Sequence, residues 1–214
     1  MKYIENVEVF GWNAALRGMR NPKNSWDKAD SILEKGKEYI GPNDMRLAQA
    51  LNSAGPEHRK FLRMIHVQFD VTLPRYVWSE FDTYHHNVKN SCSTMHKLFV
   101  KGQDIKLEDF IEPEEVCQTD VLETYNFVIT KLNKFKDDYF NTPLTEGLKR
   151  DRILRAAKQI LPEGWLQKRT VDTTYEELKV IYHQRKNHRL PEWRAMLDEL
   201  MEQLPYAKEF ITGE

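Results

Sequence analysis

The chain has few cysteines and no long apolar run. Its two cysteines, Cys92 and Cys117, lie far apart in the sequence and form no CxxC pair, which argues against a disulfide framework and the common zinc-binding spacings. No stretch reaches the roughly 18 consecutive apolar residues of a membrane-spanning helix, and the segment Met1 to Glu5 has no apolar signal region. We therefore expect a soluble protein of the reducing cytoplasm that has no membrane partner.

A large net charge is also missing. With 32 basic and 33 acidic residues the formal net charge is -1, so no overall field attracts nucleic acid, and any phosphate binding must come from local clusters. No internal repeat, low-complexity tract or Gly/Ser-rich linker divides the 214 residues. The simplest prediction is a single domain spanning residues 1–214 that binds no nucleic acid.

Helical spacing dominates the pattern of apolar residues. Residues 3–10 and 64–73 alternate in the manner of strands, whereas Trp12 to Met19 has the spacing of an amphipathic helix. Further helices are expected at about 43–53, 112–141, 145–161, 173–185 and from 191 onward. Because the strands need partners, we predict an α+β fold in which several helices cover a small, mainly antiparallel sheet.

Local signals predict the ends of these helices. Asn43 and Asp44 are expected to cap the helix at 43–53, and Gly55 followed by proline breaks it. Acidic residues at 112–115 favour the start of the long helix through the helix dipole. The pattern that begins at Thr173 has the Ser/Thr-x-x-Glu form of a capping box.

The segment from His58 to His96 is unusually rich in residues that carry chemistry. It contains the strand at 64–73, then Pro74, which is well tolerated in the first turn of a helix, and then a polar loop. That loop holds histidines, asparagines, serines and a cysteine, which suit the lining of a pocket better than a core.

This order of residues resembles the flavin-dependent thymidylate synthases, which have a histidine, a Phe-rich strand, a proline-started helix, an Arg-His-Arg loop and then Asn-Glu-x-Ser-x-Arg. When the comparison is anchored on Pro74, no gap is needed. His58 falls on the family's upstream histidine, Asn90 on its asparagine and Ser93 on its active-site serine. The chain departs from the pattern where the Arg-His-Arg positions read Thr83-Tyr84-His85, the glutamate reads Ser91 and the last arginine reads Met95.

A second segment extends the resemblance. Residues 157–162 correspond to the family's Ala-Arg-x-x-Leu-Pro segment, with Lys158 at the basic position. Arg185 follows at the distance of a helix that carries the family's substrate arginine. The two matched regions together span roughly residues 45 to 195.

The resemblance implies an enzyme that binds FAD and transfers a one-carbon group to C5 of a uridine nucleotide, converting dUMP to dTMP. NADPH and methylenetetrahydrofolate are the implied co-substrates, and a homotetramer is implied because each active site of the family is assembled from several subunits. The implied catalytic residues are Ser93 and Arg185, and the implied cofactor-binding residues are His58, His85, His86, Asn90 and Arg189. The implied substrate-binding residues are Glu80, Ser93, Lys158 and Arg185.

Each of these residues also has a plainer interpretation. Ser93 can be a helix cap, His58 a surface residue, and Arg185 with Arg189 one face of a solvated helix end. A metal site is a rival, because Cys92 and His96 have i, i+4 spacing near His85 and His86, but we predict no metal.

Alternative functions stay open at this point. They are another modification of a pyrimidine nucleotide, a relative that binds a nucleotide or protein partner without catalysis, and a helical module that binds nucleic acid through the basic patch at 183–189.

Overall fold

The computed structural model describes residues 1–34 and 37–213, which form two compact units. Unit 1 comprises Met1–Val71, Tyr84–Asn90 and Arg169–Glu214, and unit 2 comprises Thr72–Thr83 and Ser91–Lys168. The strands are β1 Ile4–Phe10, β2 Ile32–Glu34, β3 Lys37–Tyr39, β4 His66–Pro74, β5 Val88–Ser91 and β6 Leu166–Thr174. The α-helices are α1 Trp12–Arg20, α2 Pro42–Ala54, α3 Arg75–Phe81, α4 Thr94–Lys97, α5 Gln118–Asn141, α6 Gly147–Ile160, α7 Tyr175–Arg185 and α8 Pro191–Gln203.

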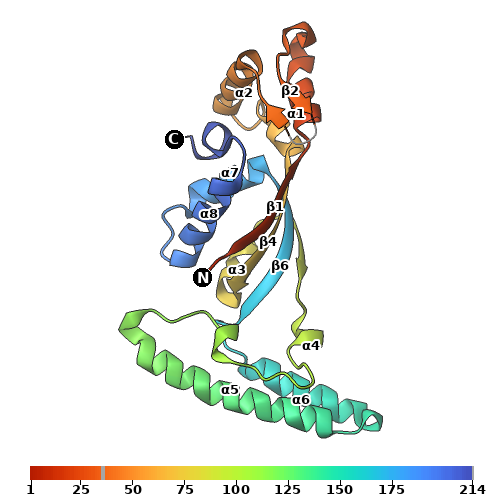
Figure 1. The fold of residues 1–214 in the computed structure, drawn as a ribbon, viewed down its shortest axis with the longest axis vertical. Coiled ribbons are helices and arrows are strands. Elements are labelled where there is room, and N and C mark those ends of the chain that lie inside the picture. Colours follow the sequence, from red (N-terminus) through yellow and green to blue (C-terminus); the bar gives the residue numbers. More distant parts are fainter. Residues whose placement is uncertain (35–36, 214) are drawn as a thin grey trace. The chain divides into compact units, whose positions relative to one another are not determined.

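The main sheet has the strand order β1-β4-β6-β5, so strands from distant parts of the sequence become neighbours. β1 lies antiparallel to β4 (Figure 1), with Ile4 opposite Val71 and Phe10 opposite His66. In β4, Val67 and Val71 are fully buried whereas His66 is exposed, which is the period-two pattern of a strand with one covered face. The predicted strands and the predicted α+β fold class are confirmed.

An aromatic cluster forms much of the core of unit 1. The ring of Trp12 meets the rings of Tyr175 and Tyr206 edge-on, at centroid distances of 5.2 and 5.7 Å, which is a favoured arrangement for aromatic pairs. Phe210 packs against the same indole at 6.1 Å. The hydroxyl of Tyr175 donates a hydrogen bond of 2.7 Å to the carbonyl of Pro205, so the polar tip of this fully buried ring is satisfied.

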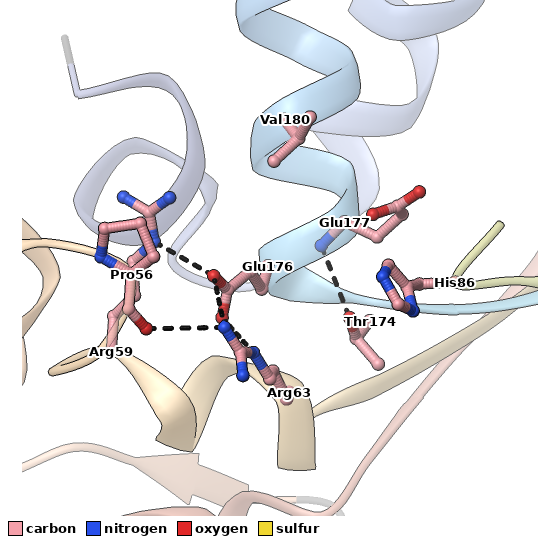
Figure 2. Close-up of a pocket in the computed structure, with 8 residues that line it drawn as sticks. All are labelled: Pro56, Arg59, Arg63, His86, Thr174, Glu176, Glu177 and Val180. Carbon is pink, nitrogen blue, oxygen red and sulfur yellow. Dashed lines mark hydrogen bonds and ion pairs between the residues drawn. The ribbon is translucent and has the colours of Figure 1, made fainter. Parts of the chain in front are cut away.

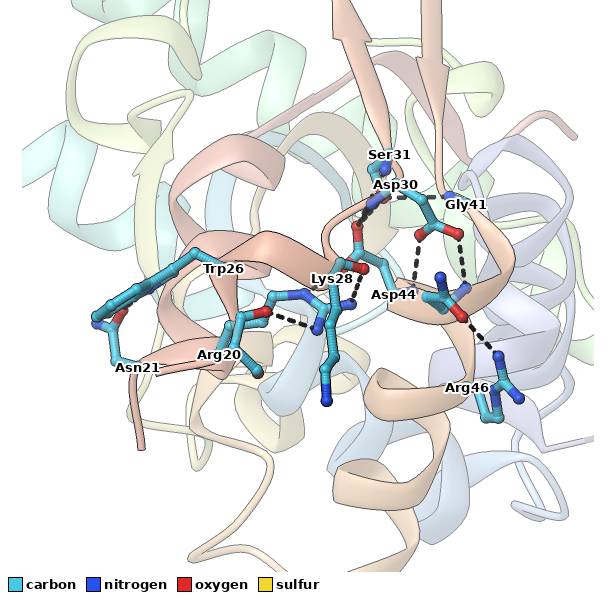
Figure 3. A network of polar contacts seen from close by, with 11 residues as sticks. Arg20, Asn21, Trp26, Lys28, Asp30, Ser31, Gly41, Asp44 and Arg46 are labelled. Atoms are coloured by element: carbon cyan, nitrogen blue, oxygen red, sulfur yellow. Dashed lines mark hydrogen bonds and ion pairs between the residues drawn. The ribbon is translucent and has the colours of Figure 1, made fainter. Parts of the chain in front are cut away.

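A buried polar network ties α1 to α2 in unit 1 (Figure 3). Arg20 and Asp44, which are 3% and 1% exposed, form an ion pair of 2.6 Å between Nε and Oδ1. The other oxygen of Asp44 accepts hydrogen bonds from the hydroxyl and the backbone N–H of Ser31. Asp30 accepts hydrogen bonds from the backbone N–H groups of Asn43 and Asp44, and so it caps α2 from outside the helix.

This network corrects the predicted start of α2. The helix begins at Pro42, one residue earlier than expected, and Asp44 lies inside its first turn, where its carboxylate is committed to Arg20 and Ser31. Partial desolvation pushes the pKa of Asp30 upward, but hydrogen bonds from two backbone N–H groups and the charge of Arg20 bring that pKa below its usual value.

Unit 2 is built around the helices α5 and α6, which run side by side (Figure 1). Leu132 of α5 and Ala157 of α6 are fully buried in its core, and Tyr125 packs on Phe110 with ring centroids 4.8 Å apart. Several apolar side chains of the unit are exposed instead. They are Val116, Phe127, Leu144 and Leu148, at 92%, 64%, 83% and 78%.

The other helix boundaries follow the sequence signals, with small shifts. Gly55 ends α2 with φ of 127°, and Pro191 starts α8. The cap of α7 is Thr174, one residue after the predicted Thr173, and its hydroxyl accepts from the backbone N–H of Glu177. The long helix α5 begins at Gln118 rather than near residue 112. Pro113 disfavours helical backbone angles only at Glu112, and residues Glu115–Cys117 form a 3-10 turn before α5.

Two strands of the sheet were not predicted. Residues 88–91, expected as part of a polar loop, form β5, and residues 166–174 form β6. In the described residues no helix is both long and apolar enough to cross a membrane.

Candidate functional site

A cavity of about 510 Å³ lies beside the first turn of α7 in unit 1 (Figure 2). Its volume falls within the range of roughly 300–1,000 Å³ typical of small-molecule sites. His86, one of the predicted cofactor-binding residues, lies on its wall. The full lining is Pro56, Arg59, Arg63, His86, Thr174, Glu176, Glu177 and Val180.

Two arginines and one glutamate form an ion-pair cluster in this cavity. Arg63 Nε lies 2.8 Å from Glu176 Oε2, and Arg59 Nε lies 3.3 Å from Glu176 Oε1. The hydrogen bond and the charge of Glu176 raise the pKa of Arg63. Nearby on α7, burial lowers the pKa of Lys179, the charge of Arg59 lowers it further, and Glu176 opposes the shift.

His85 and His86 share a second, shallower cavity of about 270 Å³ with His66 and Asp172. His66 Nδ1 lies 3.1 Å from Asp172 Oδ1. Although histidines gather here, no group of three or more His, Cys, Asp or Glu side chains in the described part of the chain is arranged to hold a metal ion.

The geometry assumed for the rival metal site is wrong. Cys92 precedes the cap residue of α4, which starts at Thr94, so Cys92 and His96 do not share one helical turn. The backbone N–H of Cys92 instead donates to the carbonyl of Lys168.

Arg185 is the last residue of α7 and sits in an aromatic and polar setting within unit 1. Its Nε donates a hydrogen bond of 2.9 Å to the hydroxyl of Tyr84, and its Nη1 lies 2.9 Å from His188 Nε2. The guanidinium also lies over the ring of the fully buried Trp193, 5.2 Å from the centroid. These contacts fix the plane of the guanidinium, as a bidentate contact with phosphate or a uracil edge requires.

Arg189 does not share a helical face with Arg185. α7 ends at Arg185, and the chain then turns, so the i, i+4 relationship assumed from the sequence is wrong. Arg189 is exposed on the loop between α7 and α8.

His58 and Asn90 lie apart from the cavity beside α7. His58 lines another cavity of unit 1, next to Phe61 and Met64, and its half-exposed ring lies 3.4 Å from Glu57 Oε1. Asn90 is exposed on β5. Unit 1 therefore brings His85 and His86 together but separates His58 from them.

In unit 2, Ser93 lines a cavity of about 310 Å³ together with Thr94, Lys97 and Gln167. Its hydroxyl accepts a hydrogen bond of 3.2 Å from the backbone N–H of Met95, which confirms the plainer prediction of a helix cap. Lys158 Nζ lies 3.0 Å from Met95 Sδ. Glu80 is half-buried on α3, outside that cavity.

Sequence reasoning missed the ion-pair cluster of the cavity beside α7. Arg59 and Arg63 have i, i+4 spacing, and Glu176 and Glu177 follow the capping threonine, so each pair looks like an ordinary local helix feature. Arg59 and Arg63 meet Glu176 across more than a hundred residues. A sequence pattern therefore gives no sign of the contact.

Comparisons with known proteins show which solved structures share this fold. No family model and no curated protein matches the chain. Two crystal structures of flavin-dependent thymidylate synthase ThyX from Helicobacter pylori, both with FAD and dUMP, match it with TM-scores of 0.69 and 0.70 at 14% identity. The matches cover 97% and 98% of this chain and 97% of each of those chains.

The chain shares the fold of flavin-dependent thymidylate synthase. The likeness spans nearly the whole of both chains, so the resemblance read from residues 45 to 195 is confirmed at the level of fold. The sequences are only 14% identical, so what the proteins share is the arrangement of their helices and strands.

Proposed function

We propose that the protein is an FAD-dependent enzyme that transfers a one-carbon group to C5 of a uridine nucleotide, converting dUMP to dTMP. One observation carries the proposal: the fold matches, over nearly its full length, structures that hold both FAD and dUMP. Residues 1–214 would act as one catalytic domain in the cytoplasm, with NADPH and methylenetetrahydrofolate as co-substrates and without a nucleic-acid partner.

Arg185 is the strongest candidate for nucleotide binding. Tyr84, His188 and Trp193 hold its guanidinium in place, so little side-chain freedom would be lost on binding the phosphate or the uracil edge of dUMP. Lys158 would add positive charge in unit 2, and Glu80 would accept from a base N–H. Ser93 would contact the pyrimidine without acting as a nucleophile, because its hydroxyl serves as a helix cap and no base is committed to it.

The cavity beside α7 is the proposed site for the ring system of a flavin, because it has the volume of a small-molecule site and polar side chains converge on it. His85 and His86 are the proposed contacts for the rest of FAD, and His58, Asn90 and Arg189, which are not part of this cavity, would contact it from another subunit. Bound FAD would supply the reducing electrons, while the protein binds and orients the nucleotide and excludes water.

Exposed apolar side chains of unit 2 support the proposed homotetramer. Phe127 of α5 and Leu148 of α6 are more than half exposed, as is Leu144 between these helices. Large apolar side chains on a surface are candidates for protein–protein contact. Association of subunits would cover it and would bring together site residues from different chains.

A changed pocket supports a second candidate function, another modification of a pyrimidine nucleotide. Tyr84 stands at the middle position of the family's Arg-His-Arg loop, and its hydroxyl contacts both Arg185 and Gln184. A phenol at this place alters the chemistry next to the proposed nucleotide site. The group transferred would then differ from a methyl group.

An activity assay tests the proposal. Purified protein is incubated with dUMP, FAD, NADPH and methylenetetrahydrofolate, and the nucleotide products are identified by mass spectrometry. We expect dTMP, and we expect Arg185→Ala to lower the rate about 100-fold through loss of a preorganised cationic contact.

The matched control is Arg46→Ala, which removes an exposed arginine whose one hydrogen bond within the described residues is to Asn43 in the same turn. It should leave the rate unchanged. A product of another mass would favour the second candidate function. Binding of dUMP without any product would indicate the non-catalytic relative, and complementation of a thymidine-requiring strain gives an independent check.

A further inference from the structure

The helical hairpin of α5 and α6 in unit 2 carries acidic and basic residues on different parts of its length. Residues 110–130, which include the first half of α5, contain five acidic residues and no basic residue. Residues 131–158, which include the rest of α5 and most of α6, contain eight basic and four acidic residues. The start of α5 is therefore negative, whereas its second half and α6 are positive.

The acidic charges lie on the outer side of α5. Asp120 and Glu123 precede Phe127 by seven and four residues, so the three side chains share one face of the helix. All three residues are exposed, whereas Tyr125 and Leu132 are buried on the other side. Neither carboxylate forms an ion pair within the part of the chain that the structure describes. We call Asp120 and Glu123 the acidic face.

A basic face of the same kind lies on α6. Arg152 and Arg155 follow Leu148 by four and seven residues, so these three side chains also share one side of a helix. They are exposed, whereas Leu154 and Ala157 are buried in the core of the unit. Among the described residues, neither guanidinium has an ion-pair partner. We call Arg152 and Arg155 the basic face.

The two faces together indicate the kind of partner that fits this surface. Phe127 and Leu148, which are 64% and 78% exposed, lie beside the charges, as at a protein–protein contact. The acidic face would repel a nucleic acid, and the basic face would repel a basic protein. A second copy of this chain carries both complements, and a two-fold axis brings each acidic face to the other copy's basic face.

The spacing of the charges fits such an axis. A short turn joins α5 to α6, and the two helices lie side by side (Figure 1), so α6 runs back along the second half of α5. Counted from this turn, Arg155 and Arg152 lie about 9 and 13 Å beyond the level of Phe127. Glu123 and Asp120 lie about 6 and 10 Å before that level. A two-fold rotation near Phe127 therefore superimposes the two faces within the reach of an arginine side chain.

We propose that a second copy of this chain docks antiparallel on the hairpin of α5 and α6, around a two-fold axis near Phe127. Asp120 of each copy lies opposite Arg152 of the other copy, and Glu123 lies opposite Arg155. Charge complementarity fixes the antiparallel orientation, because a parallel arrangement would bring like charges together. This inference rests on the proposed function for the expectation that subunits associate, and it names one surface through which they do so.

The experiment uses two charge-reversal variants of the full-length protein. Asp120→Lys with Glu123→Lys reverses the acidic face, and Arg152→Glu with Arg155→Glu reverses the basic face. In each variant alone the two faces repel each other, so self-association should weaken at least tenfold relative to the wild type. Sedimentation velocity over a concentration series measures the association.

Mixing the two variants in equal amounts tests the pairing itself. In a mixed pair the introduced lysines meet the introduced glutamates, and the unchanged acidic face of one variant meets the unchanged basic face of the other. Association should therefore return to near the wild-type strength. A variant that had merely lost its fold would not recover on mixing, so recovery separates a docking contact from a structural role.

The matched control is Asp198→Lys with Glu202→Lys, which makes the same change of charge at two exposed i, i+4 positions of unit 1, on α8. It should associate as the wild type does. A monomeric wild-type protein, variants that associate like the wild type, or a mixture that stays dissociated would each overturn the proposed contact.

The activity assay separates this inference from the proposed function. Formation of dTMP together with a mixture that stays dissociated would overturn the contact and leave the activity standing. Recovery on mixing in a protein that neither binds FAD nor forms dTMP would support the contact and overturn the activity.

Discussion

Units 1 and 2 differ in where they place charged and apolar side chains. Unit 1 buries ionic contacts, between Arg20 and Asp44 and around Glu176, and covers its aromatic cluster. Unit 2 leaves large apolar side chains such as Leu144 and Leu148 on its surface, and the ion pair between Lys134 and Asp138 is exposed. Large apolar side chains are exposed in unit 1 as well, for example Ile32, so the clearer difference lies in the ion pairs. Arg20 and Asp44 of unit 1 are both buried, whereas the buried Lys136 of unit 2 pairs with an exposed aspartate, Asp104.

The largest change in the free energy of unfolding is expected when the buried ion pair of unit 1 is broken. Arg20→Met leaves Asp44 buried without its cation, which should lower the free energy of unfolding by about 3–5 kcal/mol. The matched change in unit 2, Lys134→Met, breaks an exposed i, i+4 pair and should cost at most about 0.5 kcal/mol. Urea unfolding measures both, and equal losses would contradict the difference between the units.

Replacing one glycine in each unit should give a smaller difference in stability between the units. Gly11 has φ of 95°, and a Cβ there would lie 2.0 Å from the backbone carbonyl oxygen of Met64, so Gly11→Ala should cost about 3 kcal/mol. Gly102 in unit 2 has φ of 78° but no atom within 4 Å of such a Cβ. Gly102→Ala should therefore cost only the backbone strain, about 1 kcal/mol. Thermal unfolding of the two variants measures both losses of stability. A larger loss in Gly102→Ala than in Gly11→Ala would contradict the prediction.

Apolar surface on unit 2 should govern assembly. The double variant Leu144→Asp with Leu148→Asp should weaken subunit association at least tenfold, because burial of one leucine contributes about 1.5–3 kcal/mol. Ile32→Asp changes an apolar residue of unit 1 that is 58% exposed and serves as the control. Sedimentation velocity over a concentration series measures the effect. A fully monomeric wild-type protein, or equal weakening by the control, would contradict it.

The smallest effect concerns acid stability in unit 1. The folded-state pKa of Asp30 lies below the ordinary value of 3.8, so its ionised form contributes stability above that value, and the contribution is lost as the pH falls through the folded pKa. Asp30→Asn should therefore be less stable than the wild type at neutral pH, and the difference should shrink as the solution approaches about pH 2. Unfolding free energies measured across this range should converge, and a constant difference would argue against the role of Asp30.

Local signals in the sequence predicted most of the helices. Gly55 and Pro191 set helix ends through backbone geometry that depends on a few neighbouring residues, and these ends are confirmed. The cap of α7 was predicted one residue too early, at Thr173 instead of Thr174. β6 was missed because its first half, through Lys168 and Arg169, has no apolar alternation, so its pairing depends on β4 rather than on its own residues.

The same limit applies to the site. His86 and Arg185 were predicted because each belongs to a recognisable segment. The contacts of Arg59 and Arg63 with Glu176 join positions far apart in the chain, so no local pattern predicts them. Sequence patterns predict local backbone geometry well, but they do not predict which charged residues pair when the residues are far apart in the chain.

Titration of the purified full-length protein with FAD, followed by visible absorbance and then by addition of dUMP, tests the central claim most directly. The account predicts saturable FAD binding with a perturbed flavin band, and a further spectral change when dUMP binds. A protein that binds no FAD, and whose mixture with FAD does not respond to dUMP, would contradict the claim that this fold serves flavin-dependent nucleotide chemistry.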